Sequence, residues 1–217
     1  MKIFNYDRVS STPYIYSLLG ALALSATSTQ AASMVLDWNE LFSGVLKDST
    51  QNQNPGYASR SMAMMNIGMY DGYASSSSTT SASTFYEYDT NFHSTTTNAT
   101  SEVAAAQAAF KVLSSLYSDQ QTELNSFRTS SLSGYSATDL SNGVALGNKI
   151  SDRIIANRMN DGWNNTVSYT YNNTPGSFQP DPLNPTVPVW GPGWGNVATF
   201  AISSTDGFVP AAPPALT

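Results

Sequence analysis

The sequence predicts an all-α protein, a helical bundle followed by a long, irregular C-terminal arm rich in proline and glycine. Three observations lead to this fold class. Apolar residues recur at helical spacing through much of residues 35–158. A serine followed three positions later by Gln or Asp, which is typical of helix starts, occurs twice in the predicted helical domain. Prolines and glycines crowd the end of the chain, where they prevent long helices. We therefore expect a signal peptide at 1–31, a helical domain at 32–162 and an extended arm at 163–217.

The first 31 residues have the features of a secretory signal peptide. Lys2 and Arg8 give a basic start, an apolar run covers residues 14–24, and small residues lead up to Ala31. The run is shorter than the ~18 apolar residues that a membrane span needs. We expect cleavage after Ala31, a secreted or periplasmic protein, and no transmembrane segment after cleavage. An uncleaved membrane anchor is the alternative.

Two helices are expected next. Residues 35–45 place apolar side chains on one helical stripe. Pro55 and Gly56 break this pattern, and a second helix is predicted over residues 57–73. This second helix is apolar almost all round, so we expect it to be buried, with its methionines in the core rather than on a metal. Residues 75–84 are nearly all Ser or Thr and predict a flexible loop.

Two further helices follow this loop. An alanine-rich amphipathic stretch predicts a helix over residues 103–116. Ser118 with Gln121 forms a capping-box pattern and predicts the start of the next helix. Gly134 is expected to end it.

The last predicted helix starts at Ser136, which forms a second capping-box pattern with Asp139. It is expected to end just before Gly162, because glycine readily takes the left-handed conformation found after helices. Beyond Gly162 we expect an extended arm that wraps other elements.

Composition excludes several kinds of function. The net charge is -6 and charged residues make up only 11% of the chain, so the clustered cations that bind nucleic acid are missing and we expect no nucleic-acid partner. The absence of cysteine excludes a disulfide framework, a thiolate zinc site and a cysteine nucleophile. A polar but weakly charged composition suits a secreted or cell-surface protein.

Three groups of short motifs occur in a defined order along the chain. The first is VLDWN (35–39) with PGYASR (55–60) and NIGMYDG (66–72), the second is AAAQAAFKVL (104–113) with RMNDG (158–162), and the third is VWGPGWGNVATF (189–200) with FVPAAPPAL (208–216). Together they resemble the vanadium-dependent haloperoxidases and acid-phosphatase-like proteins. The resemblance spans nearly all of the chain after residue 34. It implies part of a haloperoxidase-like helical fold and, for the family, a vanadate or phosphate site.

The oxyanion-binding motifs of that family are missing from this sequence. They are a Lys/Arg-Pro motif, a Ser-Gly-His motif and a later Ser-Arg...His motif. No lysine here has Arg-Pro at the right distance, Ser43-Gly44 and Ser133-Gly134 lack the histidine, and Ser59-Arg60 has Asn66 where a histidine would follow. The resemblance thus implies no catalytic, cofactor-binding or metal-binding residue and no vanadate cofactor in this chain, which we interpret as an N-terminal portion without its catalytic half.

Four other polar residues remain as candidates. His93, the single histidine, lies in a polar loop without a carboxylate partner, which is typical of a surface residue. Arg60 and Asp71 are three helical turns apart and would share a face, either as oxyanion supports or as buried polar anchors. Asp161 is interpreted as part of the turn with Gly162.

Aromatic residues stand among Asn, Thr and Gly in the predicted arm. They are Trp163, Tyr169, Tyr171, Trp190 and Trp194. Such a mixture could stack against sugars, or it could pin the arm onto the helices. Both interpretations stay open.

Three functions compete at this stage. The chain could be a catalytically incomplete haloperoxidase- or phosphatase-like portion, a secreted binding or assembly module, or a free-standing enzyme that uses His93, Arg60 and Asp71. Because helices 57–73 and 104–116 are apolar over wide faces, we expect the chain to associate with itself or with a complementary helical chain.

Overall fold

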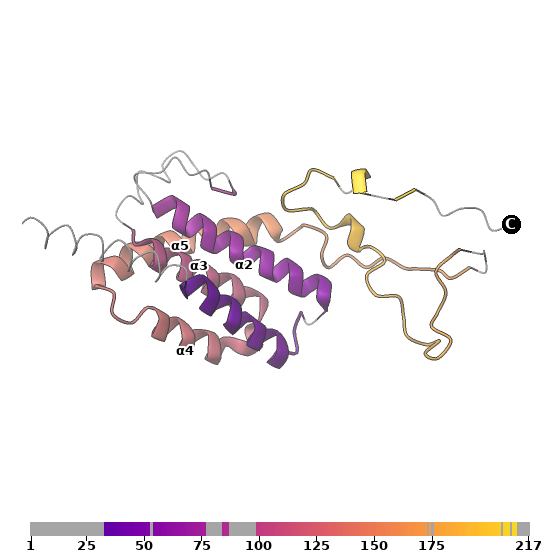
Figure 1. Cartoon of the computed structure of the whole chain (residues 1–217), viewed down its shortest axis with the longest axis horizontal. Helices are drawn as coiled ribbons and strands as arrows, with labels where there is room; N and C mark the ends of the chain where they lie inside the picture. The colour runs from indigo at the N-terminus through magenta and orange to yellow at the C-terminus, as the bar shows by residue number, and fades with distance from the viewer. Residues whose placement is uncertain are drawn as a thin grey trace, which may run out of the picture.

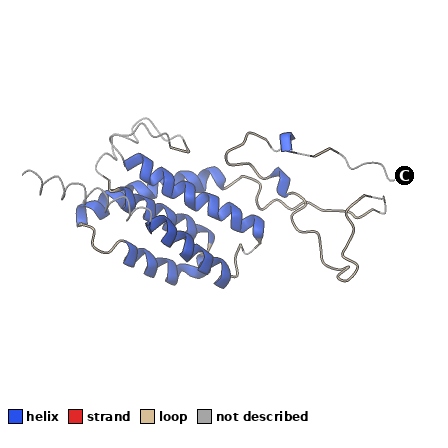
Figure 2. Cartoon of the chain, viewed as in Figure 1, coloured by secondary structure: helices blue, strands red, loops and turns tan. Residues whose placement is uncertain are grey.

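The computed structural model of the chain describes residues 33–52, 54–76, 84–86, 99–172, 174, 176–204, 206–208 and 210–211. All regular secondary structure within these ranges is helical, as Figures 1 and 2 show, which confirms the all-α prediction for this part of the chain. The predicted signal peptide, its cleavage site and His93 lie outside the described residues.

Five α-helices correspond to the five that the sequence predicts. They are a first helix over residues 33–48, α2 (Pro55–Ser76), α3 (Ser101–Leu116), α4 (Gln121–Ser131) and α5 (Ala137–Arg158). The helix α2 starts earlier than predicted, because Pro55 occupies its first position, where proline has no N–H to leave unpaired. Asn54 accepts hydrogen bonds from the next free N–H groups, those of Gly56 and Ala58.

Helix α3 is the centre of the bundle and contacts α2, α4 and α5. Its small side chains allow close packing, and residues 103–109 are all buried. Glycines on the neighbouring helices meet it backbone to backbone. A Cβ atom at Gly72 would lie 2.8 Å from the backbone nitrogen of Ala105, and one at Gly147 would lie 2.6 Å from the carbonyl oxygen of Ala104. The bundle therefore depends on the absence of side chains at these positions.

Helix 33–48 makes aromatic contacts with α4 and with Tyr117, the residue that follows α3. Trp38 packs edge-on against Phe127 with ring centroids 4.9 Å apart, and Phe42 packs against Tyr117 at 5.7 Å. Trp38, Phe42 and Tyr117 are fully buried. Each of these pairs adds to the area that the residues bury.

The two predicted capping boxes have different outcomes. Ser136 caps α5 as predicted, since its hydroxyl accepts the N–H of Asp139 at 3.1 Å. The prediction at Ser118 is wrong. A 3-10 turn, η2 (Ser118–Gln120), precedes α4, and the helix has no side-chain cap. The N–H of Ser118 is instead bound by the side chain of Gln51 at 3.0 Å, a contact across the fold that local sequence does not encode.

Beyond Arg158, the described residues contain only two short 3-10 turns, η3 (Trp194–Asn196) and η4 (Asp206–Phe208). Gly162 has a positive φ of 92°, in agreement with its predicted left-handed conformation. Figure 1 shows this segment leaving the end of the bundle where α2 begins and α5 ends. Most of its side chains are exposed, so the described part of the segment does not wrap the helices as expected.

Candidate functional site

A buried cluster of three charged side chains joins α2 to the end of α5. The carboxylate of Asp161 accepts Arg60 Nε at 2.7 Å and Arg158 Nη2 at 2.8 Å on the same oxygen. These side chains are only 1%, 6% and 5% exposed. We call Arg60, Arg158 and Asp161 the Asp161 cluster. Its carboxylate is shielded from water and is held between two guanidinium groups.

The Asp161 cluster supplies partners that the sequence interpretation did not identify. Asp161 does serve the turn, because its other oxygen accepts the N–H of Trp163 at 3.1 Å, but its main partners are the two arginines. Arg60 does not pair with Asp71 along α2. Asp71 accepts the N–H of Phe85 at 2.5 Å and that of Tyr86 at 3.3 Å. Arg60 and Asp71 are both buried, as the interpretation of the two residues as buried polar anchors requires.

Arg158 also ties down the segment that follows the bundle. Its guanidinium donates to the carbonyl of Ala198 at 2.6 Å and to that of Thr199 at 3.1 Å, and it lies 3.8 Å from the ring centroid of Phe200. The N–H of Ala198 donates in turn to the backbone carbonyl of Asp161 at 2.8 Å. These hydrogen bonds attach Ala198 and Thr199 to Arg158 and Asp161, about forty residues earlier in the chain. We call this attachment the clip.

Tyr86 lies within the electrostatic field of this cluster. Burial is the largest influence and raises the pKa of Tyr86 above its ordinary value of 10.0, while the charge of Arg158 opposes that rise. Its hydroxyl therefore stays protonated at neutral pH. This residue and the two bonds to Asp71 attach residues 84–86 to the bundle.

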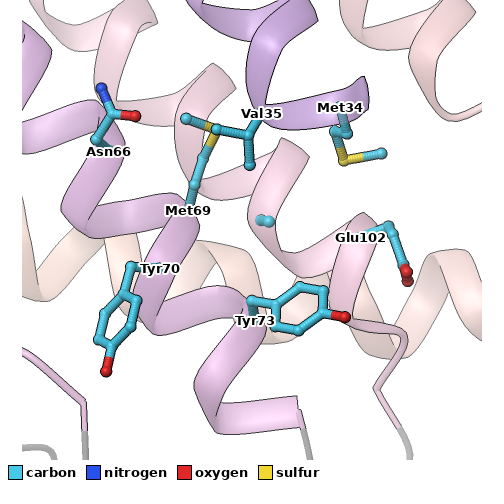
Figure 3. Close-up of a pocket in the computed structure, with 8 residues that line it drawn as sticks. Met34, Val35, Asn66, Met69, Tyr70, Tyr73 and Glu102 are labelled. Carbon is cyan, nitrogen blue, oxygen red and sulfur yellow. The ribbon is translucent and has the colours of Figure 1, made fainter. Parts of the chain in front are cut away.

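A second candidate is an apolar cavity of about 430 Å³ between helix 33–48, α2 and α3. It is lined by Met34, Val35, Asn66, Met69, Tyr70, Tyr73, Glu102 and Ala105. Figure 3 shows Met69 and Val35 on one side and the ring of Tyr73 on another. The Asn66 amide already bonds Asn39 at 3.2 Å, so the lining offers chiefly apolar surface. A volume of this size is within the range of small-molecule sites.

The cavity shows where the prediction of a fully buried second helix fails. Met64, Met65 and Met69 are in the core, but Tyr70 and Tyr73 are 52% and 46% exposed. Helix α3, in contrast, is buried over residues 103–109 and at Val112 and Leu113, and it contributes only Glu102 and Ala105 to the cavity lining. Sequence periodicity could not find the cavity, because α2 is apolar on both its buried and its exposed side.

The third candidate is a cluster of aromatic rings at the start of α2. Tyr57 makes edge contacts with Trp163, Trp190 and Trp194 at centroid distances of 5.6, 5.8 and 5.3 Å. Beside these rings lies a pocket of about 270 Å³. The remaining predicted aromatics, Tyr169 and Tyr171, contact each other and Phe178 instead. The pinning interpretation thus holds for the tryptophans, whose rings pack on the helical bundle.

The charged groups offer few ligands for a metal or cofactor. Within the described ranges, no three His, Asp or Glu side chains come close enough together to hold a metal ion. The two buried arginines are both bonded to Asp161. Among the helices that the structure describes, none is long and apolar enough to cross a membrane.

The chain was also compared with profiles of known protein families, with curated proteins and with solved structures, and none of them matches it.

Proposed function

We propose that this chain is a secreted, catalytically incomplete portion of a vanadium haloperoxidase- or acid-phosphatase-like protein, and that it works by binding a complementary helical segment. The main support is the apolar cavity between helix 33–48, α2 and α3. Val35, Tyr70 and Tyr73 line it and are 41%, 52% and 46% exposed. Contiguous apolar surface of this kind usually marks an interaction site.

The partner in this proposal is an amphipathic helix. Such a helix presents apolar side chains at every third or fourth position and can insert several of them into one groove. The cavity is larger than any single side chain and is bordered by three helices, which suits this mode of binding. In the family relationship that we propose, the partner would bring the oxyanion-binding residues that are missing from this sequence.

The Asp161 cluster supports a scaffold role for the motifs. Arg60 and Asp161 belong to two of the stretches that resemble the family, and they bond each other in the interior. Together with Arg158 they hold α2, α5 and the following segment in register. In this proposal residues 1–31 are removed on secretion, residues 32–162 form the scaffold and residues 163–217 form an arm attached at the cluster.

The proposal is tested by association and by activity. The purified chain should self-associate or bind a hydrophobic dye in the absence of its partner, and it should lack haloperoxidase and phosphatase activity with or without vanadate. Val35→Lys combined with Tyr73→Lys should abolish the dye binding and the association seen by light scattering. Leu183→Lys, a change at a residue that is 87% exposed and does not line the cavity, is the matched control.

Two results would contradict the proposal. One is a monodisperse wild-type chain with a sharp melt and no dye binding, because the apolar surface would then be inert. The other is turnover above the buffer blank that is lost in Arg60→Ala, which would favour a free-standing enzyme.

A second candidate function is a secreted or cell-surface binding module on the same scaffold. The aromatic pocket favours it, because the half-exposed Trp190 ring beside polar side chains suits ligand binding.

A further inference from the structure

We propose that the aromatic pocket binds a neutral hexopyranose sugar. The pocket lies between Tyr57 at the start of α2 and two separate parts of the following segment, residues 162–167 and 188–197. Three of the four tryptophans of the chain, Trp163, Trp190 and Trp194, line it. This inference does not depend on the helical partner proposed above.

The rings are held in place before any ligand arrives. A Cβ atom at Gly56 would lie 2.5 Å from the Trp190 ring and 2.8 Å from the Trp194 ring, so both indoles rest directly on the first turn of α2. They lie 5.4 Å apart and are tilted by 43°. Trp190 nevertheless remains 47% exposed. A rigid ring that is supported on one side and open on another loses little entropy when a ligand stacks on it.

The loop around Trp194 is equally well fixed. The N–H of Trp194 donates to the carbonyl of Gly191 at 2.8 Å, and the N–H of Asn196 donates to that of Gly193 at 3.0 Å. Gly193 is buried so closely against Val167 that no side chain would fit there. The clip at Ala198 anchors the end of this loop to the Asp161 cluster.

The lining selects for a neutral ligand that is both apolar and hydroxylated. No charged residue lines the pocket. Asn165 and Thr166 do line it, and neither side chain hydrogen-bonds a described residue. Their amide and hydroxyl groups are therefore open to a ligand, beside the indole rings. A pyranose ring combines a flat C–H face for stacking with hydroxyls that both donate and accept hydrogen bonds at its edge.

The size of the pocket limits how much of a sugar can enter. Its volume of about 270 Å³ is near the lower end of small-molecule sites, which begin at roughly 300 Å³. This favours one ring, either a free sugar or one end of a longer chain. A β-linked glucose is the best match, because all its ring hydroxyls are equatorial and both of its faces are free for stacking.

The test is a titration of the full chain with cellobiose, followed by tryptophan fluorescence and by saturation-transfer NMR. We expect saturable binding, with the fluorescence change arising from the rings in the pocket, and similar affinity for cellohexaose if only one terminal ring enters. Trp190→Ala should weaken binding at least tenfold. Asn165→Ala should weaken it about threefold to tenfold while leaving every ring in place. Val187→Ala, an exposed position outside this pocket, should leave binding unchanged.

Several outcomes would overturn the inference. They are the absence of saturable binding at millimolar cellobiose, equal binding of the anion gluconate, and binding that survives both Trp190→Ala and Asn165→Ala. Binding of a proline-rich peptide in place of the sugar would also refute it, because aromatic grooves recognise such peptides too. Trp190→Phe keeps an aromatic ring against Gly56, and it replaces Trp190→Ala in the binding test if the alanine variant fails to fold. It should retain partial binding.

Discussion

Replacing Asp161 by asparagine should destabilise the protein more than any other conservative change of a single charge. The substitution keeps the shape of the side chain and an oxygen for the N–H of Trp163, but it removes the negative charge between Arg60 and Arg158. Both arginines are nearly inaccessible to water. Removing one partner of a buried ion pair costs about 3–5 kcal/mol. We expect the lower end, about 3 kcal/mol, because each arginine retains hydrogen bonds to backbone carbonyls.

The free energy of unfolding measured by urea titration tests this value directly. A loss of about 3 kcal/mol should lower the melting temperature by roughly 6–12 °C for a chain of this size. The matched control is Asp152→Asn, which breaks the exposed pair of Asp152 with Lys111, at 2.6 Å, and should cost less than about 1 kcal/mol.

A double variant separates charge burial from loss of contacts. Arg60→Met removes one of the two buried charges, so combining it with Asp161→Asn should recover part of the stability lost by Asp161→Asn alone. The reasoning fails if Asp161→Asn costs no more than Asp152→Asn. It also fails if the two changes at the cluster simply add.

Three further predictions concern the helices. Gly72→Ala should destabilise the fold by about 1–3 kcal/mol, because the added methyl group would press on the backbone of α3. Gly44→Ala should stabilise it by up to about 1 kcal/mol, because a Cβ atom there would have its nearest neighbour 3.8 Å away. Chemical denaturation of both variants tests this contrast. Ser136→Ala should shorten α5 at its start and cost about 1 kcal/mol, measurable by the same titration. Hydrogen bonds from the Ser136 hydroxyl and, to a smaller extent, the Thr100 hydroxyl hold the pKa of Asp139 below its ordinary value of 3.8. The ionised Asp139 therefore contributes its full stabilisation above pH 3.8, and this contribution is lost as the pH falls through the lower pKa of the folded state. Asp139→Asn should flatten this part of the acid unfolding curve, and an unchanged curve would contradict the assignment.

The sequence was sufficient to predict the helices because their signals are local. The hydroxyl of Ser136 reaches an N–H three residues away, and Gly134 and Gly162 both have the positive φ that their positions suggested. The failed capping box at Ser118 has the same local pattern, but a contact with Gln51 takes its N–H. Local pattern alone could not distinguish the two cases.

The candidate sites were less predictable because they are built from distant parts of the chain. Arg60 and Asp161 are about a hundred residues apart in sequence, and helical spacing relates Arg60 only to residues of its own helix, such as Asp71. The apolar cavity arises from three helices, each of which has an ordinary amphipathic or apolar pattern. The aromatic residues of the pocket were recognised as candidates, but only the fold brings Tyr57 among the tryptophans.

The clip between Asp161, Arg158 and Ala198 makes residues 162–197 a closed loop whose two ends meet at one point of the bundle. The entropy needed to close a flexible loop grows only with the logarithm of its length, so doubling the loop would cost about 0.6 kcal/mol. The length of chain between the clipped ends is therefore nearly uncoupled from the stability of the bundle. Insertions near the exposed Leu183 are tolerable in a way that insertions within α2 or α5 are not. This makes the loop a suitable place for a tag or a label.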